Sequence, residues 1–237
     1  MKPKSFTLHA DMGDLSAQEV AILYQRMFVA KNYDWWREAG EGDVVVDIGA
    51  GVGMFSARAL DAGASKVYMI EPSLSLLKTA IKNISDHLIN VEPSPVIPIN
   101  TAIGKTDVDL GNVFGCKRLP SGTQDPELIS FRELMQRFSI QKIDFLKVAA
   151  EGAEFNILTE DDLEFLATKV RHIAVLVHMS AQYGAALKFA KWRDTFLKPF
   201  VELGRVRFQD ASIKEKMFQD NYKEVLPDKF MIYITNW

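Results

Sequence analysis

Short apolar runs alternate with amphipathic segments along most of this chain. Runs such as 44–48 and 173–177 are apolar at nearly every position, which is typical of strands covered on both faces of a sheet. Between them, segments such as 73–84 carry apolar residues at helical spacing. Strands that alternate with helices predict βαβ units and a largely parallel sheet. We therefore expect an α/β fold with one doubly wound, mostly parallel seven-stranded sheet.

The predicted elements are short and regularly spaced. The predicted strands are 44–48, 66–70, 95–103, 143–148, 173–177, 206–209 and 230–234, with a possible short antiparallel excursion at 107–110. The predicted helices after the first are 52–62, 73–84, 130–138, 160–168 and 181–197. A polar loop over 111–126 is long for such a domain, and loops of this length are more often functional than not.

The first forty residues predict a helical extension. Ser16 and Glu19 have capping-box spacing, and apolar residues follow at helical spacing up to residue 30. We expect an N-terminal extension over 1–40 ahead of a domain over 41–237. Trp35 and Trp36 in this extension could cover a substrate together with the 111–126 loop, although core packing is the commoner role of tryptophans.

Composition and charge narrow the range of partners and compartments. Lys and Arg number 28 against 31 Asp and Glu, so the formal net charge is −3. This balance gives no support to a nucleic-acid partner or a membrane partner. The one cysteine, Cys116, excludes an internal disulfide and a cysteine-cluster zinc site, and it fits a reducing compartment. With no long apolar segment, we expect a cytoplasmic protein.

A glycine turn follows the first predicted strand, where open α/β sheets bind their ligands. The dinucleotide fingerprint G-x-G-x-x-G would need glycine at the position of Met54. The segment instead fits D-x-G-x-G-x-G, the pattern of class I methyltransferases that use S-adenosylmethionine (SAM). The predicted cofactor-binding residues of this turn are Asp47, Gly49, Ala50, Gly51 and Gly53.

Two further strand ends complete the predicted cofactor site. Glu71 ends the second strand, and its carboxylate can accept hydrogen bonds from both hydroxyls of a ribose, in SAM or NAD equally. Pro72 follows it, and Ser73 is a predicted cap of the next helix. At the end of the third strand, Thr101 and Ala102 could contact an adenine, and a plain strand-end turn explains them equally well.

A second polar group follows the fourth and fifth strands. Lys147 interrupts an apolar run and needs a partner, for which Glu151 is the predicted residue. His178 ends the fifth strand and could act as a general base, because the reference pKa of histidine lies near 6.5. It could also hold a divalent metal ion with Glu151. The alternatives are a structural ion pair for Lys147 and a satisfied buried histidine.

Taken together, these segments resemble the FkbM-type family of SAM-dependent methyltransferases. The matching stretches are DVVVDIGAGVGMFS (43–56), IEPS (70–73), NTAIGK (100–105), IDFLKVAAEGAEFNIL (143–158) and LVH (176–178). The resemblance implies a class I methyltransferase (Rossmann-like) fold, SAM as cofactor, and transfer usually to a hydroxyl of a small molecule, natural product or sugar. It also implies that Lys147, Glu151 and His178 fall among the polar residues of the catalytic crevice.

There is one important departure from the family pattern. The family's segment reads Leu-Lys-Ile-Asp-x-Glu-Gly, and this chain has Ala149 at the aspartate position. The change is either natural or engineered, and it would also weaken a metal site built with Glu151 and His178. Three other interpretations stay open: an inactive SAM-binding interaction or regulatory protein, an NAD-dependent oxidoreductase, and a nucleic-acid methyltransferase. The last has little support, since the N/D-P-P-Y-type segment of amino-methylating enzymes is missing after the fourth strand.

Overall fold

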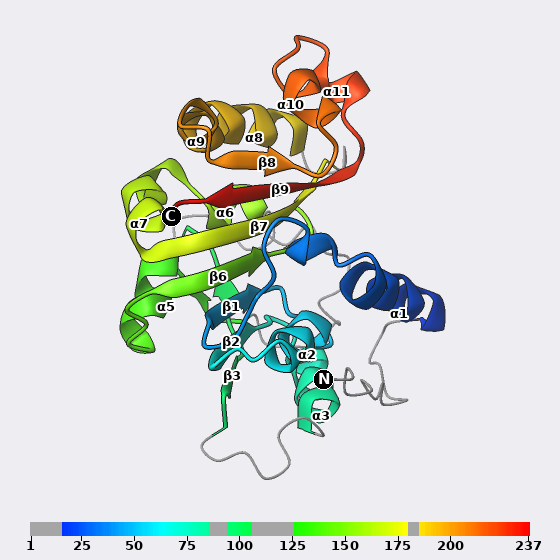
Figure 1. The fold of residues 1–237 in the computed structure, drawn as a ribbon, viewed down its shortest axis with the longest axis vertical. Helices are drawn as coiled ribbons and strands as arrows, with labels where there is room; N and C mark the ends of the chain where they lie inside the picture. Colours follow the sequence, from blue (N-terminus) through cyan, green and yellow to red (C-terminus); the bar gives the residue numbers. More distant parts are fainter. Residues whose placement is uncertain (1–15, 86–93, 106–125, 180–184) are drawn as a thin grey trace.

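A computed structural model describes residues 16–85, 94–105, 126–179 and 185–237. Its main strands are β1 (Val44–Ile48), β2 (Lys66–Ile70), β3 (Val96–Ile99), β6 (Ile143–Val148), β7 (Val170–His178), β8 (Val206–Phe208) and β9 (Lys229–Thr235). They form one seven-stranded sheet in the order β3-β2-β1-β6-β7-β9-β8 (Figure 1). The pairs from β3 to β7 are parallel, and β9 is antiparallel to both of its neighbours. The predicted sheet is confirmed, and its switch point lies between β1 and β6.

The helices flank this sheet. The N-terminal segment contains α1 (Ala17–Tyr24), the π-helical turn η1 (Gln25–Val29) and the 3-10 turn η2 (Asn32–Asp34). The others are α2 (Met54–Asp61), α3 (Leu74–Ser85), α5 (Phe131–Arg137), α6 (Glu154–Ile157), η3 (Glu160–Asp162), α7 (Leu163–Lys169), α8 (Ala185–Trp192), η5 (Arg193–Leu197), α9 (Lys198–Glu202), α10 (Ser212–Lys216) and α11 (Tyr222–Val225). The predicted capping box of the first helix is confirmed, with Ser16 and Glu19 bonded reciprocally.

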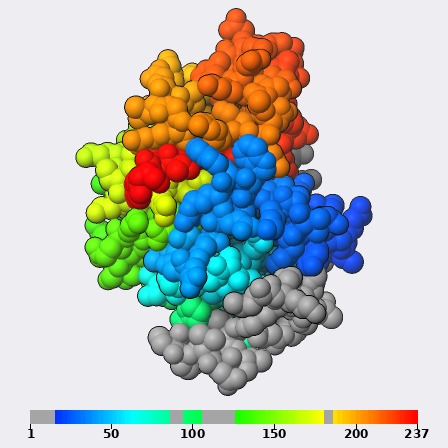
Figure 2. All heavy atoms as spheres, in the orientation of Figure 1, coloured from blue at the N-terminus to red at the C-terminus, as the bar shows by residue number. Residues whose placement is uncertain are grey.

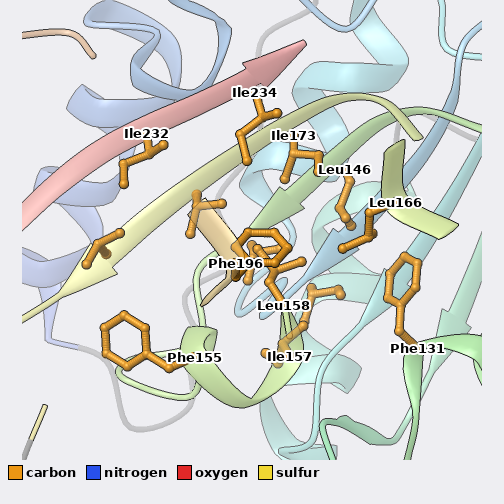
Figure 3. Packing of buried hydrophobic residues seen from close by; sticks show 14 of the residues in the cluster. Phe131, Leu146, Phe155, Ile157, Leu158, Leu166, Ile173, Phe196, Ile232 and Ile234 are labelled. Atoms are coloured by element: carbon orange, nitrogen blue, oxygen red, sulfur yellow. The ribbon is translucent and has the colours of Figure 1, made fainter. Parts of the chain in front are cut away.

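Apolar side chains bury both faces of the sheet because alternate residues of each strand point to opposite sides. On one face, Leu146, Ile173 and Ile232 pack against Leu166 and Phe196 and their neighbours (Figure 3). On the opposite face, alternate residues such as Phe145 pack with α2, α3 and the N-terminal segment. The apolar runs recognised in the sequence are therefore strands covered on both sides.

The N-terminal segment is part of this second core. Tyr33 is buried, and Asp34 forms an ion pair with Arg58 of α2. The hydroxyl of Tyr233 on β9 donates to the backbone carbonyl of Asn32. Figure 2 shows the blue N-terminal residues lying across the middle of this face, between cyan α2 and the red and orange C-terminal elements. The helical extension therefore packs as a layer of the domain and covers one face of the sheet.

Several element boundaries differ from the prediction. The expected strand 95–103 is divided, because β4 (Ala102–Ile103) pairs with β5 (Leu128–Ile129) in a separate small sheet. The expected helix 160–168 begins with a 3-10 turn and becomes α-helical at Leu163. The predicted excursion at 107–110 and nearly all of the 111–126 loop lie outside the described residues.

Candidate active site

The glycine turn after β1 has a backbone that only glycine adopts without strain. Gly49, Gly51 and Gly53 have φ values of +74°, +57° and +82°. A Cβ on Gly49 would lie 2.0 Å from the carbonyl oxygen of Ala149, so the two loops touch there through their backbones. A Cβ on Gly51 would meet no atom of the described residues within 4 Å. The turn thus packs tightly on one side and leaves open space on the other.

Glu71 closes the turn from the end of β2. Its carboxylate accepts hydrogen bonds from the backbone N–H groups of Gly51 at 2.8 Å and Ser73 at 2.9 Å. Burial raises the pKa of Glu71, and these two hydrogen bonds oppose that shift. Each oxygen has one backbone donor and so retains a lone pair for a further donor. The Ser73 hydroxyl caps α3 through the N–H of Leu76, as expected.

Lys147 lies beneath the glycine turn, and the predicted pairing of Lys147 with Glu151 is wrong. Its ammonium is 2.9 Å from the Asp47 carboxylate, not paired with Glu151, and it donates to the carbonyl of Gly49 at 2.6 Å. Both side chains are buried, at 2% and 0% exposed. The Ser56 hydroxyl donates to the other oxygen of Asp47. Asp47 and Lys147 are therefore buried beneath the turn and support its backbone.

The strand end at residues 100–102 is also tied down. The Asn100 amide donates to the carbonyls of Glu71 and Pro72 at 3.0 and 2.9 Å. The Thr101 hydroxyl is buried and donates to the carbonyl of Glu127 at 2.7 Å. Ala102 belongs to β4. The backbone of this segment thus lies beside Pro72, while the Thr101 hydroxyl already has its acceptor.

The second polar group forms a three-residue cluster. His178 Nδ1 lies 2.7 Å from Glu154 Oε1, and Nε2 lies 3.4 Å from Glu151 Oε2. Glu154 is fully buried and also accepts from the backbone N–H groups of Ala150 and Gly152. Glu151 differs from both partners because its side chain is 60% exposed. Glu154 and His178 thus form a buried pair, and Glu151 contacts this pair from the solvent-exposed side.

The electrostatics of this cluster bear on the role expected for His178. Burial alone would lower the pKa of His178, but the hydrogen bond to Glu154 and the nearby Glu151 carboxylate outweigh it and raise the pKa to about 9. The proximity of His178 is the main cause that lowers the pKa of Glu151 to about 2. The raised pKa favours the charged ring, which has no lone pair for a proton or a metal ion. The base and metal-ligand roles of His178 stay predictions, and the exposed Glu151 is the other basic group of the cluster.

A metal site is unsupported by the surrounding residues. Within the described ranges, no group of three or more His, Cys, Asp or Glu residues is arranged to hold a metal ion. The carboxylates of Glu151 and Glu154 instead pair with the charged His178. We therefore assign no step to a metal.

The polar residues lie on one face of the sheet, in two groups at different positions along the strands. Asp47 and Lys147 are register partners on β1 and β6. Ala149 lies two residues beyond Lys147, on the same face, and packs partly against the core under the N-terminal segment. His178 lies near the level of Glu151, because β7 extends beyond the end of β6. Ala149 thus sits between the buried Lys147 pair and the outer Glu151–His178 group.

Two residues beside these groups were not recognised from the sequence. The Lys229 ammonium is 3.3 Å from Glu151 Oε2, and the Tyr33 ring lies 5.5 Å from the Lys147 ammonium. Lys229 begins an antiparallel strand, so it arrives at the same sheet edge where the parallel strands end. The predicted strand at 230–234 could have indicated this, had its direction been known. Tyr33 has no comparable signal, since no site motif surrounds it in the sequence.

The sheet order, the antiparallel β9, and the glycine turn with an acidic residue at the switch point define a class I methyltransferase fold. The chain belongs to the FkbM methyltransferase domain family, whose match spans residues 47–205, more than half of the chain. A search of curated proteins finds no significant match. In the described part of the chain, no helix is long and apolar enough to cross a membrane.

Solved structures of low sequence identity have a similar fold. The FkbM methyltransferase of Methylobacillus flagellatus KT is 15% identical, with a TM-score of 0.53, over 89% of this chain and 47% of that one. A SAM-dependent methyltransferase from Aquifex aeolicus is 12% identical over 94% and 100% of the two chains, with a TM-score of 0.46. Aeropyrum pernix fibrillarin, solved with bound SAM, is 14% identical over 89% and 74%, with a TM-score of 0.45.

Proposed function

We propose that this protein transfers a methyl group from SAM to a hydroxyl oxygen of a small-molecule or glycan acceptor. The observation that carries the proposal is the contact between Glu71 and the open side of the glycine turn, with the carboxylate 2.8 Å from the N–H of Gly51. An acidic group beside an uncrowded glycine backbone suits a ribose and its attached chain. Family membership supports methyl transfer as the reaction class.

The residues present fit SAM. The open side of Gly51 provides a cradle that a side chain would fill, and Glu71 retains one lone pair on each oxygen for the two ribose hydroxyls. Gly49, Ala50 and Gly53 would shape the turn, Pro72 and Ser73 would border the ribose, and the backbone at Thr101 and Ala102 would border the adenine. Asp47 and Lys147 would act indirectly, by holding the turn in place. When bound, SAM would supply an electrophilic methyl group on sulfur and leave as a neutral thioether.

Glu151 is the residue we assign to the acceptor hydroxyl. The proton of an alcohol becomes strongly acidic as its oxygen gains a methyl group, so a weakly basic carboxylate suffices to take it. Glu151 is ionised at neutral pH and its side chain is 60% exposed, whereas Glu154 is fully buried. His178 would orient Glu151 and keep it charged. Orientation of the acceptor oxygen in line with the methyl group would provide most of the rate.

A second candidate function is SAM binding without turnover, as an interaction or regulatory protein. Ala149 favours it, because this position has a methyl group where the family pattern has a carboxylate, on the face between the two polar groups. In this case the cofactor site would be retained and methyl transfer would be absent.

The deciding experiment is calorimetric titration with SAM and with its demethylated product, alongside a methyl-release assay with a panel of hydroxylated acceptors. Binding with turnover supports the methyltransferase. Binding without turnover, both in this chain and in Ala149→Asp, supports the second candidate. If neither ligand binds, the assignment of the glycine turn is wrong. Titration with NADH is the matched negative control, because Met54 replaces the third glycine of a dinucleotide fingerprint.

A further inference from the structure

We infer that Lys229, the first residue of β9, is a positioning residue of the acceptor site that holds the Glu151 carboxylate in place. The inference rests on the role proposed above for Glu151. Lys229 lies outside the span 47–205 that matches the family, so the family match does not account for it. The site would then be completed by the C-terminal part of the chain.

Two cations converge on one oxygen of Glu151. The Lys229 ammonium lies 3.3 Å from Oε2, and Nε2 of His178 lies 3.4 Å from the same atom. Among the described residues, Lys229 and His178 both contact this carboxylate at Oε2, which leaves Oε1 for an acceptor. A carboxylate held at one oxygen by two cations on different strands has a defined direction for the other oxygen.

Glu151 needs such support because of its place in the chain. Its φ is +49°, a left-handed conformation that is rare outside glycine, and Gly152 follows with φ +106°. Its side chain is 60% exposed, so packing does little to fix its rotamer. Freezing a free glutamate in one rotamer costs side-chain entropy. Contacts that fix it in advance spare the transition state this cost.

Lys229 is itself delivered by a rigid element. It pairs in register with His178 across β7 and β9, and the N–H of Met179 donates to the carbonyl of Asp228 at 2.7 Å. The Lys229 side chain is 42% exposed. An ion pair this exposed contributes little to stability, so its removal should leave the fold intact. This separates a positioning role from a structural one.

Within the described ranges, the charged and titratable groups that face Glu151 come from four elements. They are His178 on β7, Glu154 on α6, Lys229 on β9 and the phenol of Tyr33 from the N-terminal segment. Glu154 is already bonded to His178, and the Tyr33 phenol is neutral because burial raises its pKa. Lys229 is the member of this group whose charge can be removed without opening the core.

The test compares Lys229→Met with Lys229→Arg, which keeps the charge, and with Lys198→Met as a control. Lys198 is an exposed lysine paired with Glu202 at 3.9 Å, away from the site. We expect Lys229→Met to lower kcat/KM by about tenfold to a hundredfold with SAM affinity and Tm unchanged. Lys229→Arg should recover most of the rate, and Lys198→Met should match the wild type. The acid limb of the pH–rate profile should move to higher pH in Lys229→Met, because the pKa of Glu151 rises without the cation.

A second measurement makes the result independent of turnover. The carboxyl carbon of Glu151 is titrated by NMR in the wild type and in Lys229→Met. A higher pKa and a broader signal for Glu151 in the variant support the inference. Identical titration curves, or wild-type kinetics in Lys229→Met, overturn it. Failure of the proposed function would appear differently, as absent SAM binding or absent methyl release in the wild-type chain.

Discussion

Asp47 and Lys147 face each other across β1 and β6 with their charged groups 2.9 Å apart, in a place almost closed to solvent. The same ammonium donates to the carbonyl of Gly49 at 2.6 Å. A buried pair of this kind costs desolvation energy that its attraction has to offset. Here the pair also fixes the backbone of the glycine turn, which gives it a function beyond stability.

Replacing Lys147 by methionine should destabilise the protein and weaken SAM binding together. The substitution leaves the Asp47 carboxylate buried without its partner, which costs about 3–5 kcal/mol. The Gly49 carbonyl also loses a donor, so the turn loosens. Denaturant unfolding and calorimetry measure the two effects. The control is Lys142→Met, whose half-exposed ammonium pairs with Asp144 near the surface and should contribute under about 1 kcal/mol. Unchanged stability in Lys147→Met would show that the pair is dispensable.

Gly49→Ala and Gly51→Ala should have different effects although both glycines have positive φ. An added Cβ at Gly49 collides with the backbone of Ala149, so this variant should be poorly folded. At Gly51 the Cβ meets no atom of the part of the chain that the structure describes, and the conformational cost is about 1–2 kcal/mol. Gly51→Ala should therefore fold and lose SAM affinity, because the methyl group enters the cradle. Thermal unfolding and titration distinguish the two; full SAM affinity in Gly51→Ala would contradict the assigned cradle.

Ala149→Asp should keep SAM affinity and raise the rate of methyl transfer. The new carboxylate would project between the Lys147 pair and Glu151, on the face covered by the N-terminal segment. Ala149→Asn has nearly the same size without the charge and is the matched control. A rate increase in the aspartate variant alone would identify charge at this position as the missing component. Equal rates in all three proteins would mean that the site works with alanine.

The free energy of unfolding should fall as the pH drops below 6.5, because of the buried His172. Its ring is buried between aromatic neighbours, and burial lowers its pKa to about 3, with help from Arg37 and Arg171. The unfolded chain binds a proton below its ordinary pKa while the folded chain does not, so stability is lost from pH 6.5 down to 3. The loss from pH 7 to 5 should be about 2 kcal/mol.

The variant His172→Phe isolates the contribution of His172 to the pH dependence of stability, because phenylalanine keeps an aromatic ring and cannot titrate. His178 and the carboxylates titrate in both proteins, so only the difference between them reports His172. We expect a flatter dependence of unfolding free energy on pH between 5 and 7 in the variant. Parallel curves would show that His172 is protonated in the folded protein or is not the group responsible.

The sequence was sufficient for the features that depend on local pattern. Strands such as Ile143–Val148 are apolar at the period of a buried sheet, and the Ser16–Glu19 capping box is a local hydrogen-bond motif. The glycine turn was found for the same reason, since its positive φ values require glycine at fixed spacing. Each of these signals lies within a few residues of chain.

Pairings between distant residues could not be predicted in this way. Lys147 pairs with Asp47 rather than with the nearby Glu151, because strand register and not sequence distance decides which groups meet. The charge of His178 depends on Glu154, which approaches it from another element. The split of the third strand depends on β5, a partner too short to recognise alone.

The position of β9 has a consequence for how the protein is made. This strand lies inside the sheet, between β7 and β8, yet it is translated after both of them. While synthesis proceeds, the edge of β7 therefore remains open to pairing with other chains. β9 also carries Tyr233, which bonds to the N-terminal segment, and Lys229 beside Glu151. A ribosome-bound chain that lacks β9 would thus be prone to aggregation and would have neither a closed core nor a complete site.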